Sequence, residues 1–127
     1  MGSEMCIRDR LSNCHIICSD LFEQLDKRYD FILTNPPYLK SSLDRADEEV
    51  KKHEPKLALS GGQDGLDLIN KIITASPAYL LPGGQLWLEH EPEQTDTVRD
   101  RGSQAGFKTT TFKDQYGVRR YSVLVSL

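Results

Sequence analysis

The tetrapeptide NPPY at 35–38 follows directly on the apolar segment 29–34 and could hold an amide or aromatic amine for reaction at its nitrogen. Such a nitrogen is a poor nucleophile because its lone pair is delocalised, so a catalyst must hold the NH₂ group by its hydrogens and aim it at an electrophile. The site therefore needs hydrogen-bond acceptors. The Asn35 side-chain oxygen is one such acceptor. The carbonyls of the two prolines are others, and a proline has no backbone N–H, so the backbone there can only accept. Tyr38 adds a flat face against a planar amide or base.

A methyl group on a sulfonium is an electrophile suited to this arrangement. Transfer to it requires no strong general base, since the proton can leave the nitrogen afterwards, and so no catalytic His or Glu is required. A simple turn is the structural alternative, because Asn and paired prolines often end a strand. Two neighbouring features favour a site: the acidic Asp20 at the end of the preceding apolar run, and the long loop after Asn35.

The elements that must position these residues can be predicted from periodicity. We predict strands over 14–18 and 29–34, a long loop with a short helix near 43–52, a helix over 65–81 with Asp64 as N-cap, a strand over 85–90, a helix over 95–105, and strands over 108–112 and 121–127. This order predicts an α/β fold with a mainly parallel sheet and a closing antiparallel pair. Ligands bind at the carboxyl ends of the strands in such sheets, where Asp20 and Asn35 would both lie.

The chain length and the net charge limit which classes of partner can be expected. The chain has 127 residues, which is short for a complete nucleotide-cofactor α/β domain. Sixteen Lys and Arg against 19 Asp and Glu give a net charge of −3, so no overall field attracts a polyanion and nucleic acid is not expected as a direct partner. No apolar run approaches the length of a membrane span, so we expect no membrane partner.

The cysteines at positions 6, 14 and 18 are an odd number, which argues against a disulfide framework and fits a reducing compartment. Cys14-His15 with Cys18 could be half of a zinc site. The alternation there is that of a buried strand, and no second ligand pair follows, so we predict no metal. Residues 1–12 do not continue the downstream pattern and do not form a targeting peptide; we interpret them as a truncation or assembly segment before a domain portion at 13–127.

Four blocks together resemble the HemK/PrmC family of N5-glutamine methyltransferases. They are SDLF at 19–22, YDFILTNPPY at 29–38, EPKLAL at 54–59 with GGQDGLD at 61–67, and LLPGGQLWLEH at 80–90 with Gln94. The resemblance runs from about Asn13 to the C-terminus. NPPY alone is shared with methyltransferases that act on nucleobase amines. The block at 54–67 is therefore what distinguishes the glutamine methyltransferases from them.

The resemblance implies a class I, Rossmann-like methyltransferase fold, S-adenosylmethionine as methyl donor, and as acceptor the glutamine of a Gly-Gly-Gln motif in a class 1 peptide chain release factor. Asn35, Pro36 and Tyr38 would be catalytic. The acceptor amide would be bound by Asn35, Pro36, Pro37 and Tyr38.

By the same resemblance, the cofactor would be bound by Asp20, Leu21 and Asn35, with the first two beside the adenine. Leu21 stands where some bacterial members have an aromatic residue, which weakens stacking but keeps an apolar wall. Arg119 or Arg120 falls at the family's Gly-x-x-Arg turn, although we favour a plain surface charge. Glu54-Pro55 would order the loop over the substrate or form a solvated turn.

The family's glycine-rich cofactor loop, with the acidic residue that follows it, should precede Asn13. We therefore expect the N-terminal strands to be missing, and expect that this chain alone neither binds cofactor nor folds stably. We also expect the family's helical domain, which grips the release factor, to be missing. The alternatives are an adenine-N6 or other nucleic-acid amino-methyltransferase, which acts on a flipped base, and an inactive truncated paralogue. We expect a monomer in the cytoplasm or the mitochondrial matrix.

Overall fold

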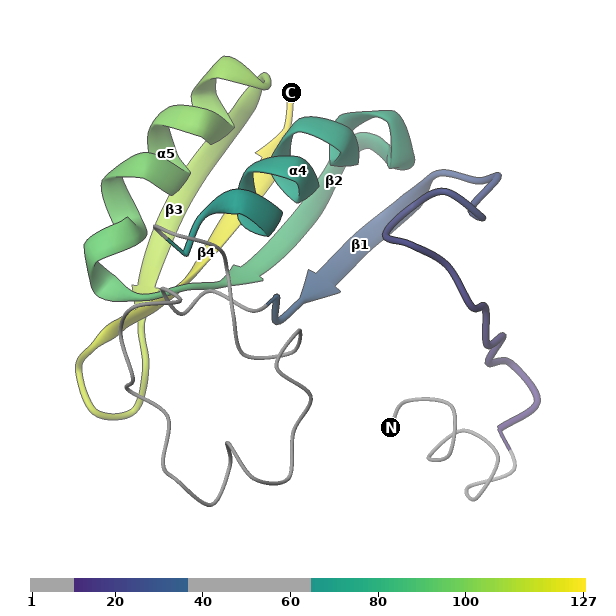
Figure 1. The fold of residues 1–127 in the computed structure, drawn as a ribbon, viewed down its shortest axis with the longest axis horizontal. Helices are drawn as coiled ribbons and strands as arrows, with labels where there is room; N and C mark the ends of the chain where they lie inside the picture. The colour runs from purple at the N-terminus through teal and green to yellow at the C-terminus, as the bar shows by residue number, and fades with distance from the viewer. Residues whose placement is uncertain (1–10, 37–64) are drawn as a thin grey trace.

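The computed structural model describes residues 11–36 and 65–127, and these contain one mixed sheet with helices. The elements in chain order are β1 (Tyr29–Thr34), α4 (Asp67–Ala75), the 3₁₀ turn η1 (Ser76–Tyr79), β2 (Leu80–Glu89), the 3₁₀ turn η2 (Pro92–Gln94), α5 (Thr95–Gln104), β3 (Phe107–Lys113) and β4 (Arg119–Ser126). The strands lie side by side in the order β1-β2-β4-β3 (Figure 1).

Strand direction in this sheet differs in part from the expectation. β1 and β2 are parallel, and β4 is antiparallel to both of its neighbours, β2 and β3. Thus β1, β2 and β3 all run the same way, as alternating strands and helices predict. The predicted mainly parallel sheet is nevertheless wrong for the neighbouring pairs, because β4 inserts between β2 and β3 and makes two of the three pairs antiparallel. The closing antiparallel pair is confirmed.

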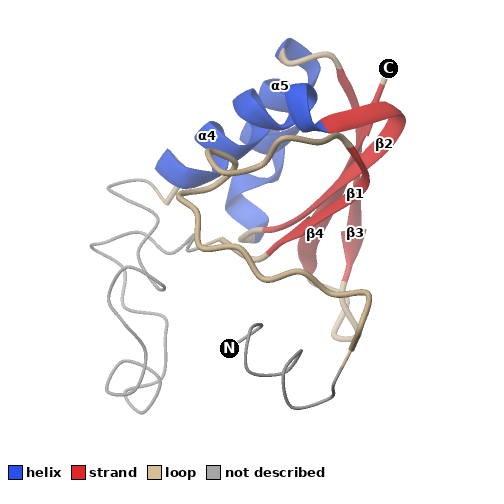
Figure 2. Ribbon diagram, turned by 90° about the vertical axis from the view of Figure 1, so that its right-hand side faces the viewer, coloured by secondary structure: helices blue, strands red, loops and turns tan. Residues whose placement is uncertain are grey.

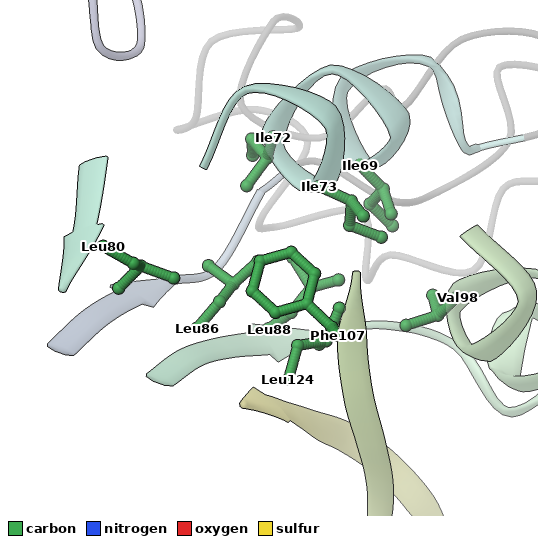
Figure 3. Packing of buried hydrophobic residues seen from close by; sticks show 9 residues of the cluster. All are labelled: Ile69, Ile72, Ile73, Leu80, Leu86, Leu88, Val98, Phe107 and Leu124. Carbon is green, nitrogen blue, oxygen red and sulfur yellow. The ribbon is translucent and has the colours of Figure 1, made fainter. Parts of the chain in front are cut away.

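Both helices cover the same face of the sheet (Figure 2). The core between them and the strands consists of buried aliphatic side chains and one phenylalanine (Figure 3), namely Ile69, Ile72 and Ile73 of α4, Leu80, Leu86 and Leu88 of β2, Val98 of α5, Phe107 of β3 and Leu124 of β4. Each buried side chain of this size contributes about 1.5–3 kcal/mol of transfer free energy. This one-sided core holds the strands in register.

The predicted helix over 65–81 is shorter in the structure. α4 ends at Ala75, and η1 follows with Pro77 in its first turn. Proline has no N–H to donate to the carbonyl of Ile73, four residues earlier, so an α-helix cannot continue through it. The Ser76 hydroxyl donates to that carbonyl instead, at 3.3 Å. The proposed N-cap, Asp64, lies outside the described residues, as does the predicted helix near 43–52.

The segment Pro82-Gly83-Gly84, expected to separate helix from strand, lies within β2. The β1–β2 register shifts here, between the pairs Tyr29–Leu80 and Phe31–Gln85. Gly83 has a φ of +76°, which favours glycine. A Cβ at Gly84 would lie 2.8 Å from the Leu81 carbonyl oxygen and 3.1 Å from that of Tyr29, so only glycine lets the two backbones approach.

The strand predicted over 14–18 is wrong. That segment is not a strand in the structure, and Ile16 and Ile17 are exposed. An extended run becomes a strand only when another strand pairs with it, and no described residue does so here. Cys14 is disulfide-bonded and Cys18 is free, so the odd cysteine count did not exclude a disulfide bond.

The remaining elements agree with the sequence pattern. β1 has its predicted bounds, and α5, β3 and β4 lie within one or two residues of theirs. α5 is buried only along a narrow stripe at Thr95, Val98 and Gly102. Across the described ranges, no helix combines the length and apolar character that a membrane crossing requires.

Candidate functional site

Asn35 stands at the carboxyl end of β1, with an exposed side chain, and the next residue, Pro36, is buried. Asn35 lines a groove of about 360 Å³ together with residues of β2 and β4. The others in the groove are Leu33, Thr34, Trp87, Leu88, Glu89 and Tyr121. The buried proline ring fixes where the chain leaves the strand, next to the groove that Asn35 lines.

The groove has an aromatic wall. Tyr121 of β4 stacks on Trp87 of β2 at 6.0 Å between ring centroids, and on Phe112 of β3 at 5.4 Å. The Trp87 Nε1–H donates to the Gln85 side-chain oxygen at 2.9 Å, which fixes the indole orientation. With Glu89 at the end of β2, the groove offers carboxamide and carboxylate oxygens beside flat apolar rings. This combination suits a planar group that carries N–H donors.

Asp20 and Leu21 lie in a turn before β1 and line a second, larger cavity of about 610 Å³ against α4 and η1. Leu21 has a φ of +52°, a left-handed conformation that is uncommon for a residue with a side chain. Phe22 stacks on Tyr79 with 4.8 Å between centroids, and the backbone N–H of Glu23 donates to the Asp20 carbonyl. These contacts hold the turn against the helix.

The predicted cofactor residues are therefore not all together. Asp20 and Leu21 line one cavity, and Asn35 lines the groove at the end of β1. The first cavity fits the adenosine part of S-adenosylmethionine in its chemistry, because it pairs a carboxylate acceptor with apolar walls from Leu21, Phe22 and Tyr79. Pro37 and Tyr38 lie outside the described residues.

A row of hydrogen-bonded polar side chains links the end of β2 to β4 and β3. His90, directly after β2, places Nδ1 2.8 Å from the Glu91 carbonyl oxygen and Nε2 2.8 Å from Ser122 Oγ, and Ser122 Oγ lies 2.7 Å from Thr111 Oγ1. A carbonyl can only accept, so Nδ1 carries the proton and Nε2 accepts from Ser122. Burial lowers the pKa of His90 from its ordinary value, and the hydrogen bond and charge of Glu91 offset part of this effect.

Arg120 forms ion pairs close to this row of side chains. Its guanidinium lies 3.0 Å from the Glu91 carboxylate and 3.6 Å from that of Asp114. Arg119 is exposed, whereas Arg120 is partly exposed and held in these ion pairs, so the interpretation as a surface charge stays a prediction for both. Gln94 is buried; its side-chain nitrogen donates to the Gly65 carbonyl at 3.1 Å, and its side-chain oxygen accepts from the Glu91 N–H. These bonds join the segments before α4 and before α5.

Sequence reasoning missed Trp87, Glu89 and Tyr121 as groove residues. The alternation in QLWLEH indicates that Trp87 and Glu89 share a face and that Glu89 ends the strand, so both could have been found. Tyr121 could not, because only the insertion of β4 beside β2 brings it there. In the described part of the chain, no group of three or more His, Cys, Asp or Glu side chains could hold a metal ion.

Comparison with solved structures defines the class of the fold. The chain is similar to a methyltransferase from Pyrococcus furiosus, with a TM-score of 0.61 and 18% identity over 98% of this chain and 54% of that one. It is also similar to a ribosomal protein L11 methylase from Lactobacillus delbrueckii, with a TM-score of 0.64 and 11% identity over 98% of this chain and 50% of that one. The fold is that of part of a class I methyltransferase, as expected.

Curated proteins are more similar in sequence. The release factor glutamine methyltransferase of Geobacter sulfurreducens is 44% identical over 103 residues, which are 79% of this chain and 36% of that protein. The ribosomal protein uL3 glutamine methyltransferase of Bordetella pertussis is 42% identical over 99 residues, which are 76% of this chain and 32% of that protein. No family model matches. The chain corresponds to a C-terminal part of the release factor glutamine methyltransferases, and spans about a third of the length of these curated relatives.

Proposed function

We propose that the parent protein transfers a methyl group from S-adenosylmethionine to the side-chain amide nitrogen of a glutamine, in the Gly-Gly-Gln motif of a class 1 release factor. The observation that carries this proposal is the exposed Asn35 carboxamide at the carboxyl end of β1, in a groove with aromatic and carboxylate groups. The names of the relatives support the substrate. The compartment would be one in which release factors act, the cytoplasm or the mitochondrial matrix.

The residues of this chain would act by positioning. The Asn35 side-chain oxygen and the Pro36 carbonyl each accept an N–H of the glutamine carboxamide, so the nitrogen is held with its lone pair toward the methyl donor. Tyr38 covers the amide plane. Asp20 and Leu21 hold the adenosine end, and the donor supplies a methyl group on a sulfonium. The methylated nitrogen then loses its extra proton to solvent, so no strong base is required.

The test is methyl transfer by a complete enzyme, made by placing the upstream part of the Geobacter sulfurreducens protein before this chain. Mass spectrometry of a release factor incubated with S-adenosylmethionine should locate the methyl group on the motif glutamine. Asn35→Ala should lower kcat at least a hundredfold while donor affinity stays within a few-fold, because only the acceptor loses its orientation. Asn13→Ala, at an exposed asparagine outside the groove, is the control.

A full methylation rate in Asn35→Ala, with normal donor binding, would remove Asn35 from the proposed role. Intact donor binding without methylation of any release factor would contradict the proposed substrate.

Ribosomal protein uL3 is a second candidate acceptor, because a relative named for that activity is 42% identical to this chain. The same chimaera offered both proteins at equal concentration would separate the two, since the relevant acceptor should be methylated with the higher kcat/KM.

A further inference from the structure

Two cations face each other across the β3–β4 hairpin, beside its turn. Lys113 of β3 and Arg119 of β4 are cross-strand partners, and both are exposed. Side chains directly opposite one another in an antiparallel pair have Cβ atoms about 4.5–5.5 Å apart, so like charges there repel. Within the part of the chain that the structure describes, neither cation has an ion-pair partner. The pairing therefore opposes folding, and no neighbouring charge of the described residues offsets it.

The carboxylates beside the turn are engaged with other groups. One oxygen of Asp114 accepts the backbone N–H of Tyr116 at 2.8 Å and that of Val118 at 3.0 Å. The other oxygen of Asp114 lies 3.6 Å from the Arg120 guanidinium, which is also paired with Glu91 at 3.0 Å. These carboxylates hold the turn and Arg120 in place, and they leave the two facing cations for a partner outside the hairpin.

An aromatic side chain stands in the turn between the two cations. Tyr116 is 80% exposed. The backbone around it is fixed, because Asp114 N–H donates to the Val118 carbonyl at 2.8 Å and Gly117 N–H donates to the Asp114 carbonyl at 3.0 Å. A large ring on a fixed turn loses little conformational entropy when it binds. Tyr and Arg are also enriched among the residues that contribute most to protein–protein affinity.

The turn lies at the edge of the sheet that carries Asn35. β3 runs in the same direction as β1, so the turn and Asn35 both follow the carboxyl ends of strands (Figure 1). With neighbouring strands about 4.8 Å apart, β4 and β3 lie about 10–14 Å from β1 in the order β1-β2-β4-β3. A glutamine side chain held at Asn35 does not span this distance. A partner at the turn would therefore be another part of the protein that carries the glutamine.

We propose that Lys113, Tyr116 and Arg119, which we call the turn surface, bind an acidic patch of the acceptor protein away from the glutamine that is methylated. This inference rests on the proposed function and extends it, because it assigns part of acceptor recognition to a second surface. Carboxylates of the acceptor relieve the repulsion between the two cations, and the ring of Tyr116 packs against apolar atoms beside those carboxylates.

Phosphate groups also attract cations, but the charges at this edge favour a protein partner. Nucleic-acid binding requires several cations along the path of the phosphates. Here the carboxylates of Glu89, Glu91 and Glu93 follow the neighbouring strand β2 at the same edge, and the whole chain has a net charge of −3. Two isolated cations beside one aromatic ring match a small acidic patch on a protein surface.

Lys113→Glu separates binding from stability in the chimaera with the upstream part of the Geobacter sulfurreducens protein. The change converts a like-charge pair into an opposite-charge pair, so the Tm should rise by about a degree or two. The KM for the release factor should nevertheless rise about fivefold or more, with kcat within about twofold, because the acidic patch meets a carboxylate. Lys27→Glu, at an exposed cation before β1 and so at the opposite edge, is the control for net charge and should leave this KM within about twofold.

Tyr116→Ala tests the contribution of the ring. This variant should raise the KM for the release factor about threefold or more and leave kcat within about twofold. Gln115→Ala, at the exposed neighbour in the same turn, is the matched control and should leave both constants unchanged. Added NaCl should raise the KM of the unaltered chimaera and reduce its difference from Lys113→Glu, because salt screens the attraction.

An unchanged KM in Lys113→Glu and Tyr116→Ala, while the release factor is still methylated, overturns this inference and leaves the proposed function unaffected. Equal increases in Lys113→Glu and Lys27→Glu also overturn it, because net charge alone would then be responsible. Weaker binding of a single-stranded RNA oligonucleotide by Lys113→Glu, with an unchanged KM for the release factor, overturns it in favour of a nucleic-acid partner. No methylation by the unaltered chimaera contradicts the proposed function, and this inference falls with it.

Discussion

The Nε2 atom of His90 lies 2.8 Å from the Ser122 hydroxyl oxygen, and this buried bond joins the end of β2 to the middle of β4. The two residues are 32 positions apart in the sequence. The bond reinforces the β2–β4 pairing that brings Tyr121 beside Trp87, and so supports the groove without taking part in it.

His90→Leu should therefore destabilise the protein. The change removes the acceptor of the buried Ser122 hydroxyl and the donor to the Glu91 carbonyl, at a cost of about 2–3 kcal/mol in free energy of unfolding. Urea denaturation followed by circular dichroism would measure it. His15→Leu, at an exposed histidine, should cost less than about 0.5 kcal/mol. Equal losses in the two variants would mean that the row of polar side chains at His90 has no special role.

Stability should fall with acidification below the ordinary His90 pKa of 6.5. Burial depresses the pKa in the folded state, so between the folded pKa and 6.5 the unfolded chain binds a proton that the native state does not. Proton binding thus stabilises the unfolded state relative to the folded state as the pH falls, while above 6.5 the effect is absent. Denaturation at several pH values between about 5 and 8 should give a steeper slope for the wild type than for His90→Gln, which does not titrate. Parallel slopes would contradict the assignment.

Gly102→Ala in α5 should be destabilising although alanine favours helices. A Cβ there would meet Leu124 Cδ2 at 2.9 Å and would crowd Thr109 Oγ1, which is itself buried without a hydrogen-bond partner among the described residues. Overpacking of about 1–3 kcal/mol then exceeds the helix gain of about 1 kcal/mol. Thermal unfolding should show a lower Tm, whereas Ser103→Ala, exposed on the same helix, should raise it slightly. A higher Tm in both variants would show that α5 can move away from Leu124.

Arg120→Ala should reduce stability by about 0.5–1 kcal/mol, a modest effect because the guanidinium is partly exposed and its ion pairs are screened by solvent. The loss should shrink in high salt. Arg119→Ala is the control, since that side chain is exposed one residue away. A loss that does not change with salt would assign the effect to packing of the Arg120 stem in place of its charge.

The sequence alone determined the strand at 29–34, the position of NPPY at its carboxyl end, the helix at 95–104 and the closing strands. These predictions depend on local periodicity, on turn residues and on a motif whose chemistry is carried by consecutive residues. The helix over 65–81 could have been predicted at its true length, because Pro77 removes a backbone donor wherever it stands. Most of the block at 54–67, which distinguishes this family in the resemblance, lies outside the described residues, which resume at position 65.

Only the tertiary structure decided which strands lie side by side and which extended segment forms no strand. β4 inserts between β2 and β3, so Tyr121 reaches the groove and His90 reaches Ser122, and no periodicity encodes that neighbour. The apolar run at 14–18 has the composition of a strand, but it is not one, because a strand exists only when a partner satisfies its backbone groups. The physical reason is the same in each case: local preference sets what a segment can become, and long-range pairing decides what it does become.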